Sequence, residues 1–508
     1  MHSVRWVSLL VAAVAVPLAA AAPGGAPGFG PPNTVATQTA VGSLTEMQTG
    51  DLNGDGVDDL VVTRIAYPIA LETFPIGIYL GNGKGGFVDG SSMWDGPPAR
   101  TEHGRQIIIA DFNGDHRNDI FVADHGYDGP PYPGHPNSLA LSTPAGRLVD
   151  ASGNMPPESG FSHSAAAADV NHDGSVDLYV GNIWGGDQTP PEILLNDGTG
   201  HFSRAAGLLP PELSDTADYQ YTRSLFVDVN GDGSPDLVLG ADNMTADSAV
   251  LLNDGTGHFR FLKGAMPPKP FAPTAILISL ATLDINGDGH PDLLAGFTRS
   301  DPFYSGRYIQ VLVNTGGGTF RDETAKRLPK QDDGVGWPEA IRVSDLNGDG
   351  HVDFAVSVNG AYDERAPIYL DDGTGAYHPV QNPASQPFFT FADVNHDGRP
   401  DIVSASGGTT ELVDVQLQLA LPATPTGVHT TVLRDRIRLS WTAVPGATGY
   451  EIWRSAPKQE PRRIGTSEVT RFDDLQAKRG VLYRYVVRAL NQLGRSAFTP
   501  AVTGRRHP

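Results

Sequence analysis

The sequence contains no cysteine among its 508 residues, so disulfide bonds cannot hold the fold together. It has no amphipathic helical stretch of useful length, which argues against an α-helical fold. The GxSxG and HExxH motifs and the glycine-rich phosphate loop are also missing, so nothing marks a serine hydrolase, a zinc protease or a nucleotide-binding protein. After residue 22, no stretch is long and apolar enough to cross a membrane.

The first 22 residues differ from the rest of the chain. They combine Arg5, an apolar run interrupted by Pro17, and small residues that continue to Ala22. This pattern is typical of a secretory signal peptide cleaved near Ala21 or Ala22, and it is too short for a membrane span. We therefore expect a protein that is secreted, periplasmic or attached to the cell surface.

The formal net charge of −22 is unevenly distributed along the chain. Residues 422–508 contain 15 Lys and Arg against 6 Asp and Glu, a balance of +9, which leaves −31 for residues 1–421. Two regions of opposite sign indicate two domains. The strong negative charge of the first region argues against nucleic acid as a partner.

A nine-residue acidic pattern, first seen as DLNGDGVDD at residues 51–59, occurs seven times. The later copies begin at Asp111, Asp169, Asp228, Asp284, Asp345 and Asp393, at intervals of 48 to 61 residues. Several copies are followed by a second motif, an apolar strand end, a turn of Asn, Asp or Gly, and an aromatic residue; LLNDGTGHF occurs twice. This spacing indicates a tandem array of one structural unit.

Apolar residues occupy positions 2 and 10 of every acidic pattern, so each acidic loop is expected to connect two buried strands. The second motif is typical of a β-hairpin. Each unit therefore has the pattern of four antiparallel strands, and seven units predict an all-β fold with a seven-bladed β-propeller over residues 23–421. The last unit is short, and we expect residues 34–40 to supply the outer strand that closes the ring.

The spacing of the acidic residues suits a hard divalent cation. Such an ion takes six or more oxygen ligands, and a loop with donors at alternate positions can surround it if the chain bends sharply at position 6. Positions 1, 3, 5 and 9 offer side-chain oxygens and position 7 offers its carbonyl, whereas oxygen-only ligands disfavour zinc. We expect up to seven structural Ca²⁺ ions. The predicted ligands are Asp51, Asn53, Asp55, Val57 and Asp59; Asp111, Asn113, Asp115, Arg117 and Asp119; Asp169, Asn171, Asp173, Ser175 and Asp177; Asp228, Asn230, Asp232, Ser234 and Asp236; Asp284, Asn286, Asp288, His290 and Asp292; Asp345, Asn347, Asp349, His351 and Asp353; and Asp393, Asn395, Asp397, Arg399 and Asp401.

The second loop differs from the others because His116 replaces glycine at position 6, where positive φ is favourable only for glycine. We expect this loop to bind calcium last or not at all. With affinities typical of extracellular modules, each ion at about 1 mM calcium adds roughly 0.4 to 1.4 kcal/mol of stability. Seven ions would add about 3 to 10 kcal/mol, which is comparable to the net stability of a whole domain.

The seven acidic loops and the LLNDGTGHF hairpins resemble the FG-GAP/VCBS repeats of integrin alpha-subunit heads and of many secreted bacterial proteins. The resemblance covers residues 43–420. It implies a seven-bladed propeller whose acidic loops bind calcium.

Residues 422–508 have alternating strands separated by turns, which predicts an immunoglobulin-like β-sandwich. They resemble a fibronectin type III domain. The resemblance places Trp441 on the second strand, Tyr450 and Trp453 on the third, and Tyr483 at the position of the corner tyrosine. It implies a spacer or an adhesive module.

The face opposite the acidic loops is the predicted ligand face, because the longer loops gather there. Aromatic rings with dispersed polar groups suit a sugar, by stacking and hydrogen bonding. A metal-binding or general-base histidine is an alternative, and so is a rigid surface without a ligand. The predicted ligand-binding residues are His103, Arg105, His125, Tyr127, Asp128, His163, Trp184, Tyr219, Arg223, Trp337 and Glu339, and His135, Asp187 and Tyr221 fall on the same predicted face.

Three functions fit these observations. The first is an extracellular binding or adhesion module for a glycan or protein ligand, in which calcium is structural. The second is a polysaccharide-active enzyme of the lyase or dehydratase type, with its site on the predicted ligand face. The third is a scaffold whose basic sandwich docks on an anionic polymer or on the propeller. We favour the first and assign no catalytic residue, because the repeats account for almost every conspicuous side chain.

Overall fold

The structure is a computed structural model that describes residues 27–38, 42–183, 189–214, 220–242, 247–331, 334–359, 366–386, 388–406, 411–419, 422–444, 447–457, 459–491 and 494–507. The predicted signal peptide lies outside the described residues. The described chain forms two compact units. One unit contains residues 31–417, and the other contains residues 27–30 together with the chain from residue 418 onward.

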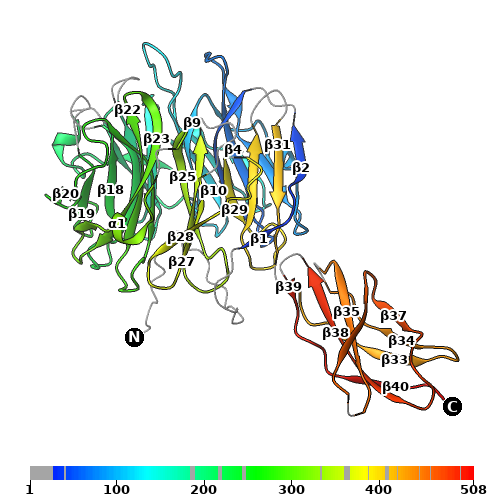
Figure 1. The fold of residues 1–508 in the computed structure, drawn as a ribbon. Coiled ribbons are helices and arrows are strands. Elements are labelled where there is room, and N and C mark those ends of the chain that lie inside the picture. The colour runs from blue at the N-terminus through cyan, green and yellow to red at the C-terminus, as the bar shows by residue number, and fades with distance from the viewer. Residues whose placement is uncertain are drawn as a thin grey trace, which may run out of the picture. The chain divides into compact units, whose positions relative to one another are not determined.

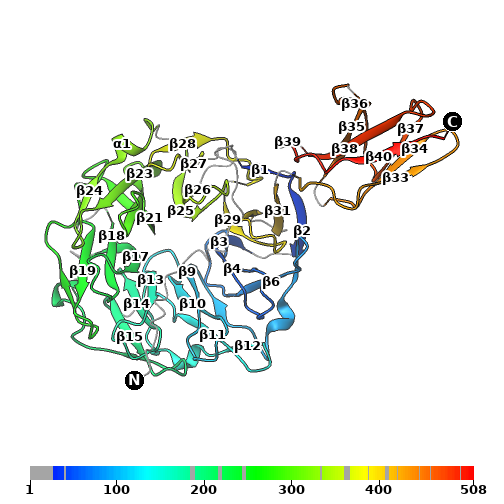
Figure 2. The ribbon, with the colours of Figure 1, turned by 90° about the horizontal axis from the view of Figure 1, so that it is seen from below.

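The larger unit consists of seven four-stranded antiparallel sheets arranged in a ring (Figure 2). The innermost strands of neighbouring sheets touch in cyclic order, and the last touches the first. This is the seven-bladed propeller arrangement that the repeats predict. From the innermost strand outward, blades one to four contain β3 (Ser43–Gly50), β4 (Asp59–Ile65), β6 (Gly77–Gly81) and β7 (Phe87–Asp89); β9 (Gly104–Ala110), β10 (Asp119–Asp124), β11 (Ser138–Ser142) and β12 (Leu148–Asp150); β13 (Ser162–Ala168), β14 (Asp177–Asn182), β15 (Glu192–Asn196) and β16 (Phe202–Arg204); and β17 (Tyr221–Val227), β18 (Asp236–Ala241), β19 (Ala249–Asn253) and β20 (Phe259–Phe261). Blades five to seven contain β21 (Ala275–Leu283), β22 (Asp292–Ser300), β23 (Phe303–Asn314) and β24 (Phe320–Asp322); β25 (Trp337–Ser344), β26 (Asp353–Asn359), β27 (Ile368–Asp371) and β28 (Tyr377–Val380); and β29 (Phe389–Ala392), β30 (Asp401–Ser406), β31 (Glu411–Gln416) and β2 (Asn33–Gln38).

The seventh blade takes its outer strand from the N-terminal part of the chain, as predicted. β2 pairs antiparallel with β31, and Figure 1 shows the two strands side by side. Asn33 lies opposite Val415 and Gln38 lies opposite Glu411. The first and last strands of the array therefore share one sheet, which closes the ring.

Apolar side chains from adjacent blades fill the space between the sheets. Those at position 2 of the acidic patterns are at most 3% exposed, and those at position 10 are fully buried. One cluster joins Leu52 and Val61 of the first blade to Ile107 and Ile120 of the second, and an equivalent cluster joins blades seven and one. The prediction that each acidic loop connects two buried strands is confirmed.

The predicted hairpins are present, and their asparagines make a contact that the sequence pattern did not reveal. The buried side-chain amide of Asn253 donates a hydrogen bond to the carbonyl of Val170, which is position 2 of the acidic loop in the preceding blade (2.9 Å). Asn196 and Asn314 make the same contact one blade earlier and one blade later, at 2.7 and 2.8 Å. Each of these asparagines therefore links two blades.

Helical segments are short within the described part of the chain. The segments are α1 (Thr324–Arg327) and the 3-10 turns η1 (Ser91–Met93), η2 (Ser152–Asn154) and η3 (Pro211–Ser214). A short ribbon of β5 (Phe74–Pro75) and β8 (Arg100–Thr101) pairs outside the blades. Among the described residues, no helix has both the length and the apolar character that a membrane span requires.

The smaller unit has two antiparallel sheets that enclose one apolar core, which confirms the predicted β-sandwich. Tyr450 and Trp453 lie on the third strand of this sandwich as predicted, whereas Trp441 follows the end of the second. The hydroxyl of Tyr483 accepts a hydrogen bond from the backbone amide of Lys478 (3.3 Å), a contact typical of a corner tyrosine. The strands of this unit are β33 (His429–Val432), β34 (Ile437–Ser440) and β37 (Arg471–Asp474) in one sheet; β36 (Arg462–Ser467), β35 (Gly449–Ser455), β38 (Leu482–Asn491), β39 (Gly494–Arg495) and β40 (Val502–Arg505) in the other; and the separate pair β1 (Gly28–Phe29) and β32 (Gln418–Leu419).

The link between blades leads to a stability prediction. Asn253→Ala should lower the free energy of unfolding by about 1–3 kcal/mol, because the carbonyl of Val170 would lose a buried hydrogen bond and the hairpin would lose the bonds that the same side chain makes within its own blade. Urea unfolding followed by circular dichroism measures this change. Arg260→Ala, an exposed position in the same hairpin, is the matched control and should change stability by less than about 0.5 kcal/mol. Equal losses in the two variants would contradict the role of the link.

Candidate functional site

The seven acidic loops lie together at one end of the ring. The side-chain amide of Asn118, in the second loop, donates to the carbonyl of Asp51 in the first (2.8 Å). The backbone amide of Asp393, in the seventh loop, donates to the carboxylate of Asp58 in the first (3.1 Å). Because each loop follows the innermost strand of its blade, the opposite ends of these strands define the other face of the ring.

The first aspartate of each loop shapes the turn. The carboxylate of Asp51 accepts hydrogen bonds from the backbone amides of Gly54, Asp55 and Gly56, at 2.7, 3.2 and 2.9 Å. The equivalent aspartates of the other six loops also accept from the amides at positions 5 and 6. The loops thus share one pattern of internal hydrogen bonds, so the same donor set recurs in each.

The ninth residue of each loop is a fully buried aspartate, and in blades one to six it connects three parts of its blade. In the fourth blade, Asp236 accepts a hydrogen bond from the amide of Val229 at position 2 (3.1 Å) and one from the amide of Asn253 at the end of the third strand (2.8 Å). Equivalent contacts occur in blades one to six. The acidic pattern predicts this residue only as a metal ligand, but it also joins the loop to the third strand.

The buried carboxylates have the electrostatic properties of a cation site. Burial, together with the aspartates at positions 1 and 5 of the same loop, raises the pKa of Asp59, Asp177, Asp236 and Asp353 to about 7. A cation among the three carboxylates would favour their charged forms. The donors are oxygens at alternate positions, so the loops fit calcium.

Positions 4 and 6 of the loops both adopt the left-handed backbone conformation. In the first loop, Gly54 has a φ of +79° and Gly56 a φ of +82°. His116 takes a φ of +66° at position 6 of the second loop, which agrees with the strain expected there. His172 and His396, at position 4 of the third and seventh loops, take φ values of +60° and +58°. Left-handed residues other than glycine are therefore not confined to the second loop.

The second loop differs from its neighbours in a further way. The side-chain amide of Asn113 donates to the carbonyl of Ser142 (3.0 Å), and the hydroxyl of Ser142 donates to Asp115 (3.0 Å). In the first loop and in the third to sixth loops, the amide at position 3 instead donates to the carboxylate at position 5. The hydroxyl of Ser142 thus engages one oxygen ligand of the second loop, on the carboxylate of Asp115.

Nine of the eleven predicted ligand-binding residues are described, and they lie at the other end of the ring. Arg105, His163, Arg223 and Glu339 occur within the first three residues of four different innermost strands, β9, β13, β17 and β25. His125, Tyr127 and Asp128 follow β10, and His103 precedes β9. Trp184, Tyr219 and Asp187 lie outside the described residues.

A buried ion pair occupies the centre of this face. A guanidinium nitrogen of Arg223 lies 3.4 Å from a carboxylate oxygen of Glu339, and the indole of Trp337 donates to the other oxygen (2.7 Å). The ring of Tyr304, at the start of β23, lies 5.0 Å from the ring of Trp337. Burial alone would raise the pKa of Glu339, but Arg105 and Arg223 bring it below the ordinary value.

Charged side chains of both signs meet at this centre. A guanidinium nitrogen of Arg342 lies 3.4 Å from the carboxylate of Glu46, which belongs to β3. Burial raises the pKa of both Glu46 and Asp128, which favours their neutral forms. The guanidinium groups of Arg105, Arg223 and Arg342 thus gather with three carboxylates, in a chain with a net charge of −22.

Three of the predicted histidines pack against one another at the side of this centre. The ring centroid of His125 lies 4.7 Å from that of His103 and 5.2 Å from that of His163. It also lies 3.5 Å from the ring of Phe161. Burial lowers the pKa of all three histidines well below the ordinary value, so they are neutral near pH 7.

Other predicted residues are placed differently. His135 lies beside Asp124, with 3.0 Å between a ring nitrogen and a carboxylate oxygen, and not with the three histidines. Tyr221 belongs to the apolar core between blades three and four. Tyr127 is half-buried in the loop after β10.

Glu46, Arg342 and Tyr304 are not among the residues that the sequence predicts for this face. A signal existed for the first two, because each is a charged residue inside a strand that the repeats place at the centre of the ring. Tyr304 lies on a hairpin that extends the fifth blade, and the repeat pattern does not predict this extension.

Comparison with protein families identifies the repeats. The model described as FG-GAP-like repeat matches residues 51–122, 111–180, 228–295, 284–356 and 345–404, which together form more than half of the chain. Integrin alpha-7 of Homo sapiens is 34% identical over 151 residues, which are 27% of this chain and 12% of that protein. Integrin alpha-V of Gallus gallus is 28% identical over 228 residues, which are 40% of this chain and 20% of that protein. The chain thus spans a fifth or less of these relatives.

A solved structure, "Structure of FN3tt mut", is similar to a smaller part of the chain. The identity is 20%, and the match covers 18% of this chain and 100% of that one, with a TM-score of 0.17. The family assignment rests on the repeats alone. The chain belongs to the FG-GAP-like repeat family.

Proposed function

We propose that this protein is an extracellular binding module whose ring is stabilised by calcium and whose ligand site is the central cluster on the face opposite the acidic loops. One observation carries the proposal: Arg105, Arg223, Glu339, Trp337 and Tyr304 converge from four different blades. Side chains that converge from distant parts of a chain at the centre of a propeller form a preorganised site. The similarity to integrin alpha chains supports a location outside the cell.

The chemistry of the cluster favours an anionic glycan as the ligand. Guanidinium groups bind carboxylates and sulfates by paired hydrogen bonds. Tyr304 and Trp337 offer aromatic faces on which a sugar ring can stack. Phe303 stacks on Tyr304 with a centroid distance of 4.2 Å and is 72% exposed, which extends the aromatic surface toward solvent.

The backbone of the aromatic hairpin is strained in a way that supports a binding role. Tyr304 has a φ of +50°, an uncommon value for a bulky side chain. Such conformations gather at functional sites, where the surrounding structure holds a side chain in a required orientation. We infer that the hairpin holds Tyr304 over the guanidinium groups.

Ligand binding is testable with an array that includes uronate-bearing, sulfated and neutral polysaccharides, read in calcium. The wild type should retain anionic glycans. Arg223→Met and Tyr304→Ala should each weaken binding by roughly tenfold or more, because one removes a charged hydrogen bond and the other a stacking face. Phe498→Ala, an exposed aromatic position of the sandwich, should leave binding unchanged. A preference for neutral glycans, or equal binding by all variants, would contradict the proposal.

A polysaccharide-active enzyme is the second candidate, and the three neutral histidines beside Arg105 favour it. A neutral imidazole can accept a proton, and a guanidinium group can bind the carboxylate of a uronate. Incubation of the array hits with the protein, followed by a search for unsaturated products, separates this candidate from simple binding. Turnover that is lost in His163→Gln would favour the enzyme.

Calcium is the proposed structural ion of the acidic loops. The support comes from the alternate oxygen donors and from the buried ninth carboxylate, which a cation would compensate. The second loop is the weakest candidate, because its residue at position 6 is the left-handed His116 and not glycine, and because the hydroxyl of Ser142 engages an oxygen of Asp115.

Chelation of calcium should lower the thermal midpoint of unfolding of the ring, because the ninth carboxylates would lose their counter-ion while buried. Calorimetric titration of the stripped protein counts the sites. Asp288→Asn, at position 5 of the fifth loop, should remove one bound ion. Asp115→Asn is the matched change in the second loop and should leave the number of ions unchanged. A melting temperature that does not change when chelators are added would refute a structural role for calcium.

A further inference from the structure

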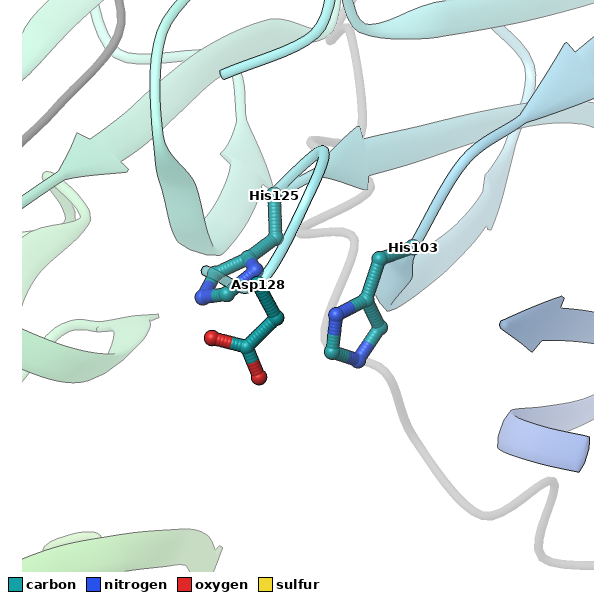
Figure 3. Close-up of side chains that lie close together, drawn as sticks. All are labelled: His103, His125 and Asp128. Carbon is teal, nitrogen blue, oxygen red and sulfur yellow. The ribbon is translucent and has the colours of Figure 1, made fainter. Parts of the chain in front are cut away.

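Two buried histidines and one aspartate form a cluster of nitrogen and oxygen donors that differs from every acidic loop. One ligand atom from each of His103, His125 and Asp128 lies within 4.8 Å of the other two. Figure 3 shows the Asp128 carboxylate next to both imidazole rings, below that of His125 and to the left of that of His103. His103 is 5% exposed and His125 is 3% exposed, so the donors are nearly shielded from water.

The hydrogen bonding of the two histidines is incomplete. The Nδ1 atoms of His103 and His125 are both buried and have no hydrogen-bond partner. A buried polar atom without a partner costs about 1–3 kcal/mol, so a native site normally supplies a partner for it. A bound metal ion is one such partner.

The backbone around the histidines is held firmly. The carboxylate of Asp124, which is fully buried, accepts hydrogen bonds from the amides of Glu102, His103 and Gly126, at 2.7, 2.8 and 3.0 Å. The amide of His125 also donates to the carbonyl of His103 (3.1 Å). Asp124 therefore fixes the residues that flank both histidines, as second-layer groups do around metal ligands.

We propose that His103, His125 and Asp128 bind one divalent transition-metal ion of the zinc class. Two imidazole nitrogens and one carboxylate oxygen are preferred ligands of such ions, whereas calcium takes oxygens alone. Three protein ligands leave a four-coordinate ion with one open position. The site is distinct from the acidic loops, because it lies at the other end of the innermost strands.

His163 is not one of the proposed ligands. One of its ring nitrogens lies 3.4 Å from the carbonyl of Thr222, so its hydrogen bonding is partly satisfied within the protein. It packs beside His125 and serves as an internal control for a buried histidine of the same cluster.

The test uses the full chain without a histidine tag, stripped of metal and then kept in excess calcium so that the acidic loops are filled. Titration with Co²⁺, followed by its visible absorption, and equilibrium dialysis against Zn²⁺ give the number and affinity of sites. The wild type should bind one ion per chain with the spectrum of a nitrogen- and oxygen-ligated ion. Asp128→Asn and His125→Gln should weaken binding at least about tenfold, because each removes a direct ligand. His163→Gln and the exposed His201→Gln should bind like the wild type.

Circular dichroism of each variant separates loss of a ligand from loss of the fold. If His125→Gln does not fold, Asp128→Asn decides the question, because Asp128 is half-buried in a loop and the change preserves its shape. The proposal is wrong if the wild type in excess calcium binds no ion. It is also wrong if folded Asp128→Asn keeps the full affinity. The test uses metal alone, so its result does not depend on the proposed glycan ligand.

Discussion

A buried carboxylate at the ninth position of each acidic loop is the interaction on which the ring depends. It is fully buried in all seven blades, and in six of them it receives amide hydrogen bonds from both the loop and the third strand. A buried charge needs such donors and a nearby opposite charge, or it destabilises the fold. This requirement explains why the acidic loops and the four-stranded blades occur together in a chain that has no disulfide bonds.

Hydrogen bonds between blades extend this local arrangement around the ring. At three junctions, the carbonyl at position 2 of one loop accepts from the hairpin asparagine of the next blade, as between Val170 and Asn253. At the junction of blades seven and one, the backbone amide of Gly85 donates to the carbonyl of Val394 (3.1 Å), so a hairpin without that asparagine makes the same link. Each blade is thus stabilised by its neighbours, as in other repeat proteins, and β2 joins the first neighbour to the last.

Much of the fold could be predicted from the sequence because it repeats. The repeated pattern predicts the acidic loops and the buried positions beside them. The short last unit predicts the closing strand. The link made by Asn253 could not be predicted, because an asparagine in a turn already has a local explanation. Glu46 and Arg342 are nearly three hundred residues apart, and only closure of the ring brings them together. Arg105, Arg223 and Glu339 could be predicted on the ligand face. Each lies near the start of an innermost strand, and the acidic loop marks where that strand ends.

The two ends of each innermost strand carry different chemistry. On β9, Arg105 stands near the start and Asp111 follows the end, so one short strand separates the guanidinium cluster from an acidic loop. The acidic ends repeat because every blade contains the same loop with its buried ninth aspartate. The other ends are free to differ, and they carry arginine in blades two and four and glutamate in blade six. A site of this kind can change its ligand by substitution at strand starts without altering the loops that stabilise the ring.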